Sequence, residues 1–106
     1  MNMKSFTDIE QSKKLAEILP IKSADMCFYY KEDIPQLIHF AKHNNRFYIP
    51  CWSLAALLGV LPSASLDSSD DHYFRMHCKE KFSEWYDNPI DAAFETINKL
   101  KENNLL

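Results

Sequence analysis

Apolar residues recur at the spacing of a helix in three stretches of the chain, residues 8–19, 54–61 and 90–100. Thr7 and Glu10 form the pattern of a capping box at the start of the first stretch. Pro20 follows its end, and a residue that precedes proline avoids the helical conformation. We therefore predict an amphipathic helix over residues 8–19.

The other two stretches also carry signals for the ends of helices. Ser53 is a suitable N-cap for the second helix, which contains no charged residue, so we expect this helix to be largely buried. Gly59, the one glycine of the chain, lies inside this helix; either the site merely permits glycine, or a neighbouring element approaches closely there. Asn88 and Pro89 suit the N-cap and first position of the third helix, and Asn103-Asn104 suits a left-handed stop at its end.

Four short segments have the composition or the alternation of β-strands, namely residues 26–30, 47–49, 73–79 and 82–86. Alternation divides the third segment into two faces. One face is apolar and carries Phe74, Met76 and Cys78. The opposite face carries Tyr73, Arg75, His77 and Lys79. A charged turn at residues 80–81 would join the last two segments into a hairpin, although a helical period also fits them.

Two regions are less regular. In residues 33–45, Asp33 and Pro35 indicate a helix start, whereas the polar run 42–45 suits the turn of a hairpin that pairs residues 36–41 with 46–49. We favour the hairpin. The Ser- and Asp-rich residues 63–71 are expected to form a mobile surface loop.

These elements predict a single globular domain over residues 1–106, of the α+β class. Consecutive strands joined by short turns pair antiparallel. We expect one small, mainly antiparallel sheet covered on one face by about three helices, in two layers. The other face of the sheet then remains open to solvent or to a partner.

Composition narrows the possible functions. The 106 residues include one glycine, which excludes the glycine-rich loops that bind phosphates and dinucleotides. A net charge of −3 without a basic stripe gives no support to nucleic acid as a ligand. The shortage of glycine also makes tight two-residue hairpins unfavourable, so we expect longer loops.

The cysteines and the hydropathy pattern bear on location. Cys27, Cys51 and Cys78 are odd in number and no signal-peptide pattern precedes them, so we expect a cytoplasmic protein. Residues 47–66 carry no charge, but their continuous apolar part, residues 54–61, is too short to cross a bilayer. No membrane association is expected.

Few residues suit catalysis or metal binding. The histidines and cysteines lack the spacing of a metal motif, and we predict no metal site and no cofactor; the histidines are His39, His43, His72 and His77. Asp67, Asp70, Asp71 and Glu84 lack the pattern of a calcium loop. Cys51 precedes a helix N-terminus, which can activate a thiol, so a small thiol enzyme is one hypothesis. The pattern otherwise offers no catalytic residue and favours a non-catalytic protein.

Three blocks of sequence resemble a known group of proteins. They are Ser23-Ala24-Asp25-Met26, then Pro50-Cys51-Trp52-Ser53-Leu54 with Leu57-Leu58 and Leu61-Pro62, and finally Asn88-Pro89-Ile90-Asp91-Ala92-Ala93. In this order they are similar to an uncharacterised family of small proteins from Bacteroides-type gut bacteria, their phages and mobile elements. The resemblance implies a cytosolic accessory protein of phage or mobile-element origin and transfers no catalytic residue.

Aromatic residues give the best indication of function, because Trp, Tyr and Arg are enriched where proteins bind each other. The candidate interaction surface consists of Tyr73, Arg75, His77 and Trp85. We predict a non-catalytic module that binds another protein or a second copy of itself. The alternative is a nucleic-acid-associated accessory factor, in which one sheet face carries Tyr73 with the cations Arg46, Arg75, Lys79 and Lys81.

Overall fold

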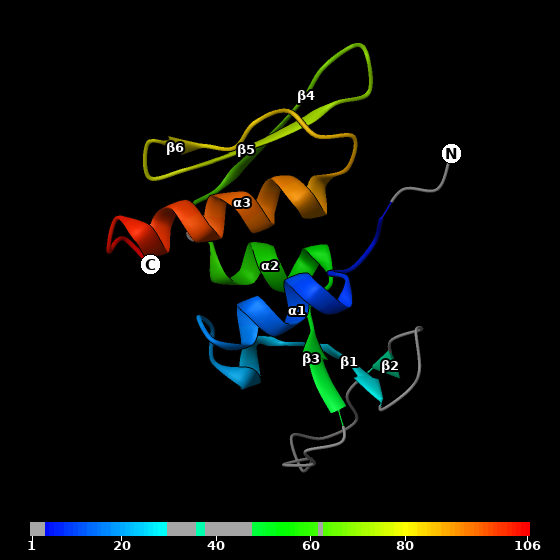
Figure 1. Ribbon diagram of the computed structural model, residues 1–106. Helices are drawn as coiled ribbons and strands as arrows, with labels where there is room; N and C mark the ends of the chain where they lie inside the picture. Colours follow the sequence, from blue (N-terminus) through cyan, green and yellow to red (C-terminus); the bar gives the residue numbers. More distant parts are fainter. Residues whose placement is uncertain (1–3, 30–35, 38–47, 62) are drawn as a thin grey trace.

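The computed structural model describes residues 4–29, 36–37, 48–61 and 63–106. Within these ranges, three α-helices lie between two small antiparallel sheets (Figure 1). The C-terminal helix α3 (Pro89–Glu102) lies directly beneath the sheet that precedes it in the chain. The α+β class and the antiparallel pairing are confirmed, but the strands form two sheets instead of the single sheet that the pattern predicts.

The first sheet has the order β2-β1-β3, formed by Gln36–Leu37, Met26–Tyr29 and Tyr48–Cys51. The central strand β1 runs antiparallel to both neighbours. The predicted pairing of residues 36–41 with 46–49 is wrong for the described residues, because β1 lies between them. The rest of that segment, with His39, His43 and Arg46, lies outside the described residues.

The helix α1 (Ile9–Ala16) begins one residue later than the pattern predicts and ends earlier. Its N-cap is Asp8, whose carboxylate accepts the Gln11 N–H at 2.7 Å. The Gln11 side chain accepts the Asp8 N–H in return at 3.1 Å, which completes a capping box. The assignment of this box to Thr7 and Glu10 is therefore wrong, because Thr7 is completely buried and its hydroxyl binds elsewhere.

The residues between β3 and α2 (Leu54–Val60) hold the N-terminal elements together. Trp52 is completely buried, its N–H donates to Thr7 Oγ1 at 3.1 Å, and its carbonyl accepts the Thr7 N–H at 2.9 Å. The indole N–H donates to Ser23 Oγ at 2.9 Å, in the short 3-10 helix η1 (Ile21–Ser23). The Ser53 N–H donates to the Asp25 carboxylate at 2.9 Å, and the Ser53 hydroxyl caps α2 as predicted. We term residues 51–53 with these partners the junction.

The helix α2 is more exposed than its composition predicts. Leu57 is completely buried, but Leu58 is 39% exposed, and Ala55 and Gly59 are also exposed. The expectation of a largely buried helix is wrong, because the described elements cover one side of α2. A Cβ added to Gly59 meets no atom within 4 Å, so the alternative in which a neighbour approaches closely is wrong as well.

The second sheet has the order β4-β5-β6, formed by Ser65–Ser68, Phe74–Cys78 and Lys81–Phe82. The strand β5 alternates as predicted, with Met76 and Cys78 buried and with Arg75 and His77 facing the other way. The expected loop over residues 63–71 is wrong where β4 forms. Its polar residues pair with β5 along their backbone, which side-chain composition does not prevent.

Residues other than glycine form the tight turns of this sheet. Lys79 and Glu80 make a two-residue turn with φ values of 49° and 67°, and Cys78 pairs with Lys81 across it. His72 takes a φ of 65° in the turn between β4 and β5. The expectation of longer loops is wrong here, because strand pairing offsets a strain of about 1 kcal/mol at a left-handed residue.

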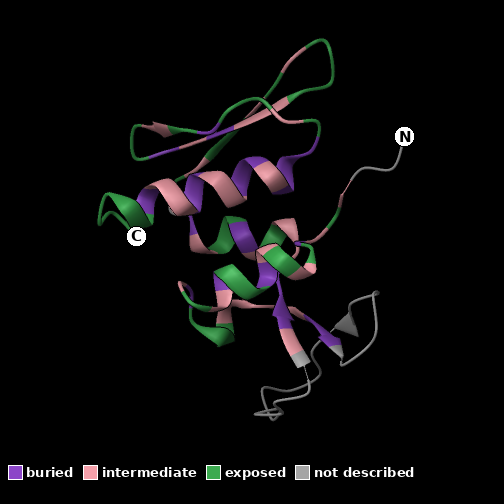
Figure 2. Cartoon of the chain, in the orientation of Figure 1, coloured by how far each residue is buried: buried purple, intermediate pink, exposed green. Residues whose placement is uncertain are grey.

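The helix α3 agrees closely with its prediction. Asn88 Oδ1 accepts the Asp91 N–H at 2.8 Å, and Pro89 occupies the first helical position. At the other end, Asn104 has a φ of 56° and the Leu105 N–H donates to the Leu100 carbonyl at 2.8 Å, as in a Schellman motif. Its buried face is turned toward the neighbouring elements (Figure 2); the buried set is Pro89, Ile90, Ala92, Ala93, Thr96, Ile97 and Leu100.

The N-terminal segment is attached to α3 through Asp91. Its carboxylate accepts hydrogen bonds from Lys4 Nζ at 2.9 Å, Gln11 Nε2 at 2.7 Å and Asn88 Nδ2 at 2.9 Å. Partial burial by itself raises the pKa of Asp91, but these hydrogen bonds and the charge of Lys4 outweigh it. The pKa is therefore held below its usual value, and the ionised form is stabilised by folding.

Replacing Gly59 by alanine is expected to stabilise the protein by about 0.5–1 kcal/mol, because alanine loses less backbone entropy in a helix. Thermal unfolding followed by circular dichroism should show a rise in Tm of about 3–6 °C. Ala55→Gly, at another exposed position of the same helix, should lower Tm by a similar amount. A lower Tm for Gly59→Ala would show that the site requires glycine.

The Asp91→Asn variant is expected to lose about 1 kcal/mol of unfolding free energy at pH 7. Because the folded pKa of Asp91 is depressed, its contribution is present above the unfolded value of about 3.9 and disappears as the pH falls through the folded pKa. Urea unfolding at pH 7 and near pH 2 measures both conditions. The exposed Asp71→Asn is the control, and a loss for Asp91→Asn that is equal at both pH values would contradict the prediction.

Candidate functional site

The face of the second sheet that points away from α3 carries aromatic and charged side chains. Arg75 and His77 project there from β5, since their neighbours Met76 and Cys78 are buried. Residues directly opposite in a ladder point to the same side, which adds Asp67 opposite Arg75 and Phe82 opposite His77. We term the outer face the set Asp67, Tyr73, Arg75, His77, Phe82 and Trp85.

The pairing between β5 and the chain after β6 contains an irregularity. His77 lies opposite Phe82, whereas Phe74 lies opposite Tyr86. Three steps along β5 thus correspond to four steps along the other segment. One extra residue on one strand is the mark of a β-bulge, which bends the strand and redirects side chains.

The bulge decides which side chains reach the outer face. Ser83 lies within it, with its N–H donating to the Met76 carbonyl and its hydroxyl accepting the Met76 N–H, both at 2.9 Å. After the bulge, Tyr86 turns toward α3, where its hydroxyl donates to Glu95 at 3.1 Å. Trp85 points the other way, beside Arg75. Without the extra residue, Trp85 and Phe82 would lie on opposite faces.

Arg75 is at the centre of the outer face. Its Cζ lies over the rings of Phe82 and Trp85, 4.7 Å from each centroid, and its Nη2 donates to Asp67 at 3.2 Å. The His77 ring stacks on Phe82 with a centroid distance of 4.1 Å and an interplanar angle of 8°. Arg75 Nε is buried without an acceptor among the described residues. The rings therefore hold the guanidinium in a fixed position at the expense of one hydrogen bond.

The outer face remains accessible. Phe82 and Trp85 are each 44% exposed, and Tyr73 is 47% exposed. These three are among the eight large apolar side chains that are exposed in the described ranges. Their gathering on one sheet face is typical of an interaction surface.

The predicted interaction surface agrees in part with this arrangement. Arg75, His77 and Trp85 lie together. Tyr73 directly precedes β5, and its carbonyl extends the ladder to Ser69, so continued alternation directs its side chain to the same face as Arg75. Two members of the outer face were not predicted. Phe82 carries a signal in the sequence, because it begins the last strand-like segment, but Asp67 lies in a region whose polar composition indicates a loop.

The cations proposed for nucleic-acid binding do not gather on the outer face. Arg46 lies outside the described residues. Lys79 Nζ donates to the Leu105 carbonyl at 2.7 Å, so this side chain is directed to the end of α3. Arg75 is paired with Asp67. Lys81 lies opposite Cys78, whose side chain is buried on the α3 side of the sheet. Of the predicted cations in the described residues, Arg75 is thus the one placed on the outer face.

Cys51 lacks the setting of a nucleophile. It is completely buried, and its Sγ lies 3.3 Å from the Thr7 carbonyl and 3.6 Å from Thr7 Oγ1. Burial raises the pKa of the thiol, and hydrogen bonds from the hydroxyls of Thr7 and Ser12 offset this only in part. A buried, protonated thiol does not attack a substrate at neutral pH.

Other candidate groups lie apart. In residues 4–29, 36–37, 48–61 and 63–106, no three potential ligands of a metal ion come together. Asp70, Asp71 and His72 are exposed in the turn between β4 and β5. Glu84 is exposed, and its N–H donates to Glu95 Oε1 at 2.5 Å.

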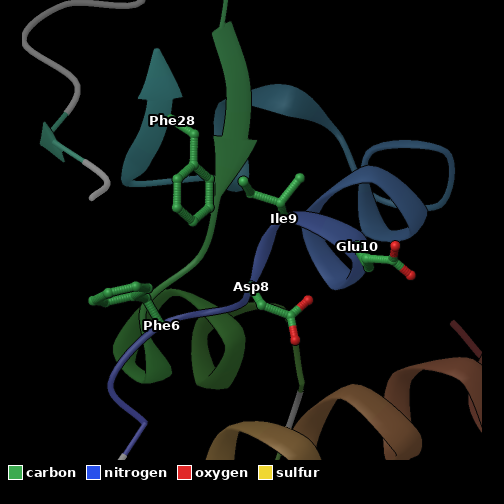
Figure 3. A pocket seen from close by; sticks show the side chains of 5 residues that line it. All are labelled: Phe6, Asp8, Ile9, Glu10 and Phe28. Atoms are coloured by element: carbon green, nitrogen blue, oxygen red, sulfur yellow. The ribbon is translucent and has the colours of Figure 1, made fainter. Parts of the chain in front are cut away.

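An open apolar hollow of about 350 Å³ lies beside α1 and β1 (Figure 3). Phe6, Ile9 and Phe28 line it, and the two aromatic rings meet edge to face with their centroids 6.3 Å apart. Asp8 at its rim is used to cap α1, and Figure 3 shows the Glu10 carboxylate directed away from the rings. The hollow therefore lacks the converging polar groups of a ligand site.

Comparison with known proteins leaves the geometry as the main guide to function. No protein-family model matches this chain, and neither does any of the curated proteins or solved structures with which it was compared. The relation to a Bacteroides-type family thus stays a prediction. Among the helices of the described ranges, none has the length and hydropathy needed to cross a membrane.

Iodoacetamide is expected to alkylate Cys51 of the native protein at least tenfold more slowly than a free cysteine at neutral pH, because burial both shields the thiol and raises its pKa. Peptide mass spectrometry resolves this cysteine from the other two. The rate in denaturant provides the reference. Native alkylation faster than that of free cysteine would instead support a thiol enzyme.

Proposed function

We propose that this chain is a non-catalytic protein-binding module and that the outer face is its binding surface. The observation that carries the proposal is the position of Arg75, held over two half-exposed aromatic rings. Residues that dominate binding energies are most often Trp, Tyr and Arg, and all three types occur on this face. The odd number of cysteines supports a cytoplasmic setting.

The fixed geometry of the outer face supports binding because little conformational entropy remains to be lost. The ion pair to Asp67 and the two rings already restrict Arg75, and His77 is stacked on Phe82. Ordering a flexible side chain on association costs about 0.5–1.5 kcal/mol, so a preorganised cluster binds with a smaller loss. The net charge of −3, and the direction of Lys79 and Lys81 away from the outer face, favour a protein over a nucleic acid as the partner.

Trp85→Ala is expected to weaken partner binding at least about tenfold, since a central tryptophan contributes about 2 kcal/mol or more. Affinity capture from the native host with quantitative mass spectrometry identifies proteins retained by the wild type. Calorimetry with the purified partner then gives the Kd of each variant. Sedimentation of the isolated chain measures whether a second copy is the partner.

Ile21→Ala is the matched control, because Ile21 is 56% exposed and lies on η1, outside the second sheet. Circular dichroism verifies that both variants fold. Equal binding by Trp85→Ala, Ile21→Ala and the wild type would overturn the outer face as the binding surface.

A further inference from the structure

The strand β4 is an edge of the second sheet. It pairs with β5 on one side, and no described strand pairs with its other side. Its residues are mostly exposed, including Leu66 at 39%. An edge strand presents unpaired N–H and C=O groups that can bind another extended chain.

The hydrogen bonds of β5 show which backbone groups of β4 face outward. The backbone N–H and carbonyl of Phe74 bond to Tyr86, and those of Met76 bond to Ser83. Both residues therefore direct their backbone groups away from β4. In an antiparallel ladder alternate residues bond to opposite sides, so Arg75 and His77 bond toward β4. Their partners Asp67 and Ser65 are therefore the β4 residues that bond to β5.

The remaining β4 residues have their backbone groups directed to the open edge. These residues are Leu66 and Ser68. The next residue supports this assignment, because the Ser69 N–H points toward the β5 side and donates to the Tyr73 carbonyl at 2.9 Å. Two N–H groups and two carbonyls, spaced two residues apart, thus form the pattern that an added antiparallel strand pairs with.

The charges next to this edge favour an added strand that carries basic side chains. Residues 63–73 contain the carboxylates of Asp67, Asp70 and Asp71 and no Lys or Arg. Asp67 already contacts Arg75 of β5, whereas Asp70 and Asp71 are exposed in the adjoining turn. Asp67 is on the outer face, and the side chain of Leu66 lies on the opposite face of β4. Cross-strand pairs of opposite charge stabilise a sheet, whereas like charges destabilise it. A second β4 would bring the same carboxylates near each other, which disfavours a second copy.

The geometry points to strand addition at β4: an extended segment of a partner protein, with basic residues alternating with apolar ones, pairs with Leu66 and Ser68. Its basic residue lies next to Asp67 on the outer face, as a second cation beside the carboxylate that Arg75 already contacts, and its apolar residue lies next to Leu66. The inference rests on the proposed function, because the added strand continues the outer face and gives the partner backbone as well as side-chain contacts.

A synthetic eight-residue peptide in which valine and lysine alternate, blocked at both ends, serves as the probe. With the isotope-labelled full chain, NMR should show that the amides of Leu66 and Ser68 shift and exchange more slowly on binding, whereas the Asp67 amide, already bonded to β5, changes little. A peptide of alternating valine and glutamate should bind at least tenfold more weakly. A peptide N-methylated at alternate residues, on the side that faces β4, should not protect either amide.

Ser68→Pro removes an outward N–H and no bond to β5, so it should weaken the valine-lysine peptide about fivefold or more. Ser68→Thr keeps the N–H and is the matched control. Unchanged affinity of Ser68→Pro, equal binding of the N-methylated peptide, or no amide protection would overturn strand addition. Self-association that Ser68→Pro abolishes would overturn the assignment to a different protein.

Trp85→Ala separates this inference from the proposed function. Loss of the host partner with Trp85→Ala, together with no peptide protection at β4, would leave the outer face as the binding surface and reject strand addition. Peptide protection that persists in Trp85→Ala, with host capture unchanged, would reject the outer face and retain strand addition.

Discussion

The buried contact between Thr7 and Trp52 is the interaction on which the N-terminal half of the fold depends. A chain that passes from a strand into a helix through the core has to supply partners for its buried backbone groups. Thr7 bonds both the N–H and the carbonyl of Trp52, and Ser23 bonds the indole. The junction thereby joins α1, η1, β3 and α2 around one tryptophan. Cys51 belongs to this arrangement as a packed thiol, which explains its position before a helix without any need for reactivity.

The C-terminal half depends on α3, whose two sides serve different neighbours. One side packs against α2 and the other against β5, so the helix separates the second sheet from the remaining elements. Because α3 covers one face of that sheet, every second side chain of β5 points to the opposite face, which is exposed. The bulge at Ser83 then adds Trp85 to Phe82 on this face, and Arg75 lies over both rings. The proposed binding surface thus arises from the same strand pairing that builds the sheet.

Local signals in the sequence were sufficient where a residue acts on its immediate neighbours. The caps at Ser53 and Asn88 and the alternation of β5 depend on contacts within a few residues, and all three are confirmed. The capping box before α1 was misplaced by one residue because a distant partner, Trp52, takes the Thr7 hydroxyl. The strand β4 was missed for a related reason, since its polar side chains conceal a backbone that pairs with β5.

The sequence by itself determined the helices, the α+β class and most of the candidate surface, because apolar periodicity and capping act along the chain. Only the tertiary structure decided that the strands form two sheets, that Phe82 and Asp67 join Arg75, and that Cys51 is buried. Each of these depends on which segments meet across long separations in the chain. A one-residue change of register reverses the faces of a strand, so the position of the bulge could be known only once β5 and the chain after β6 were paired.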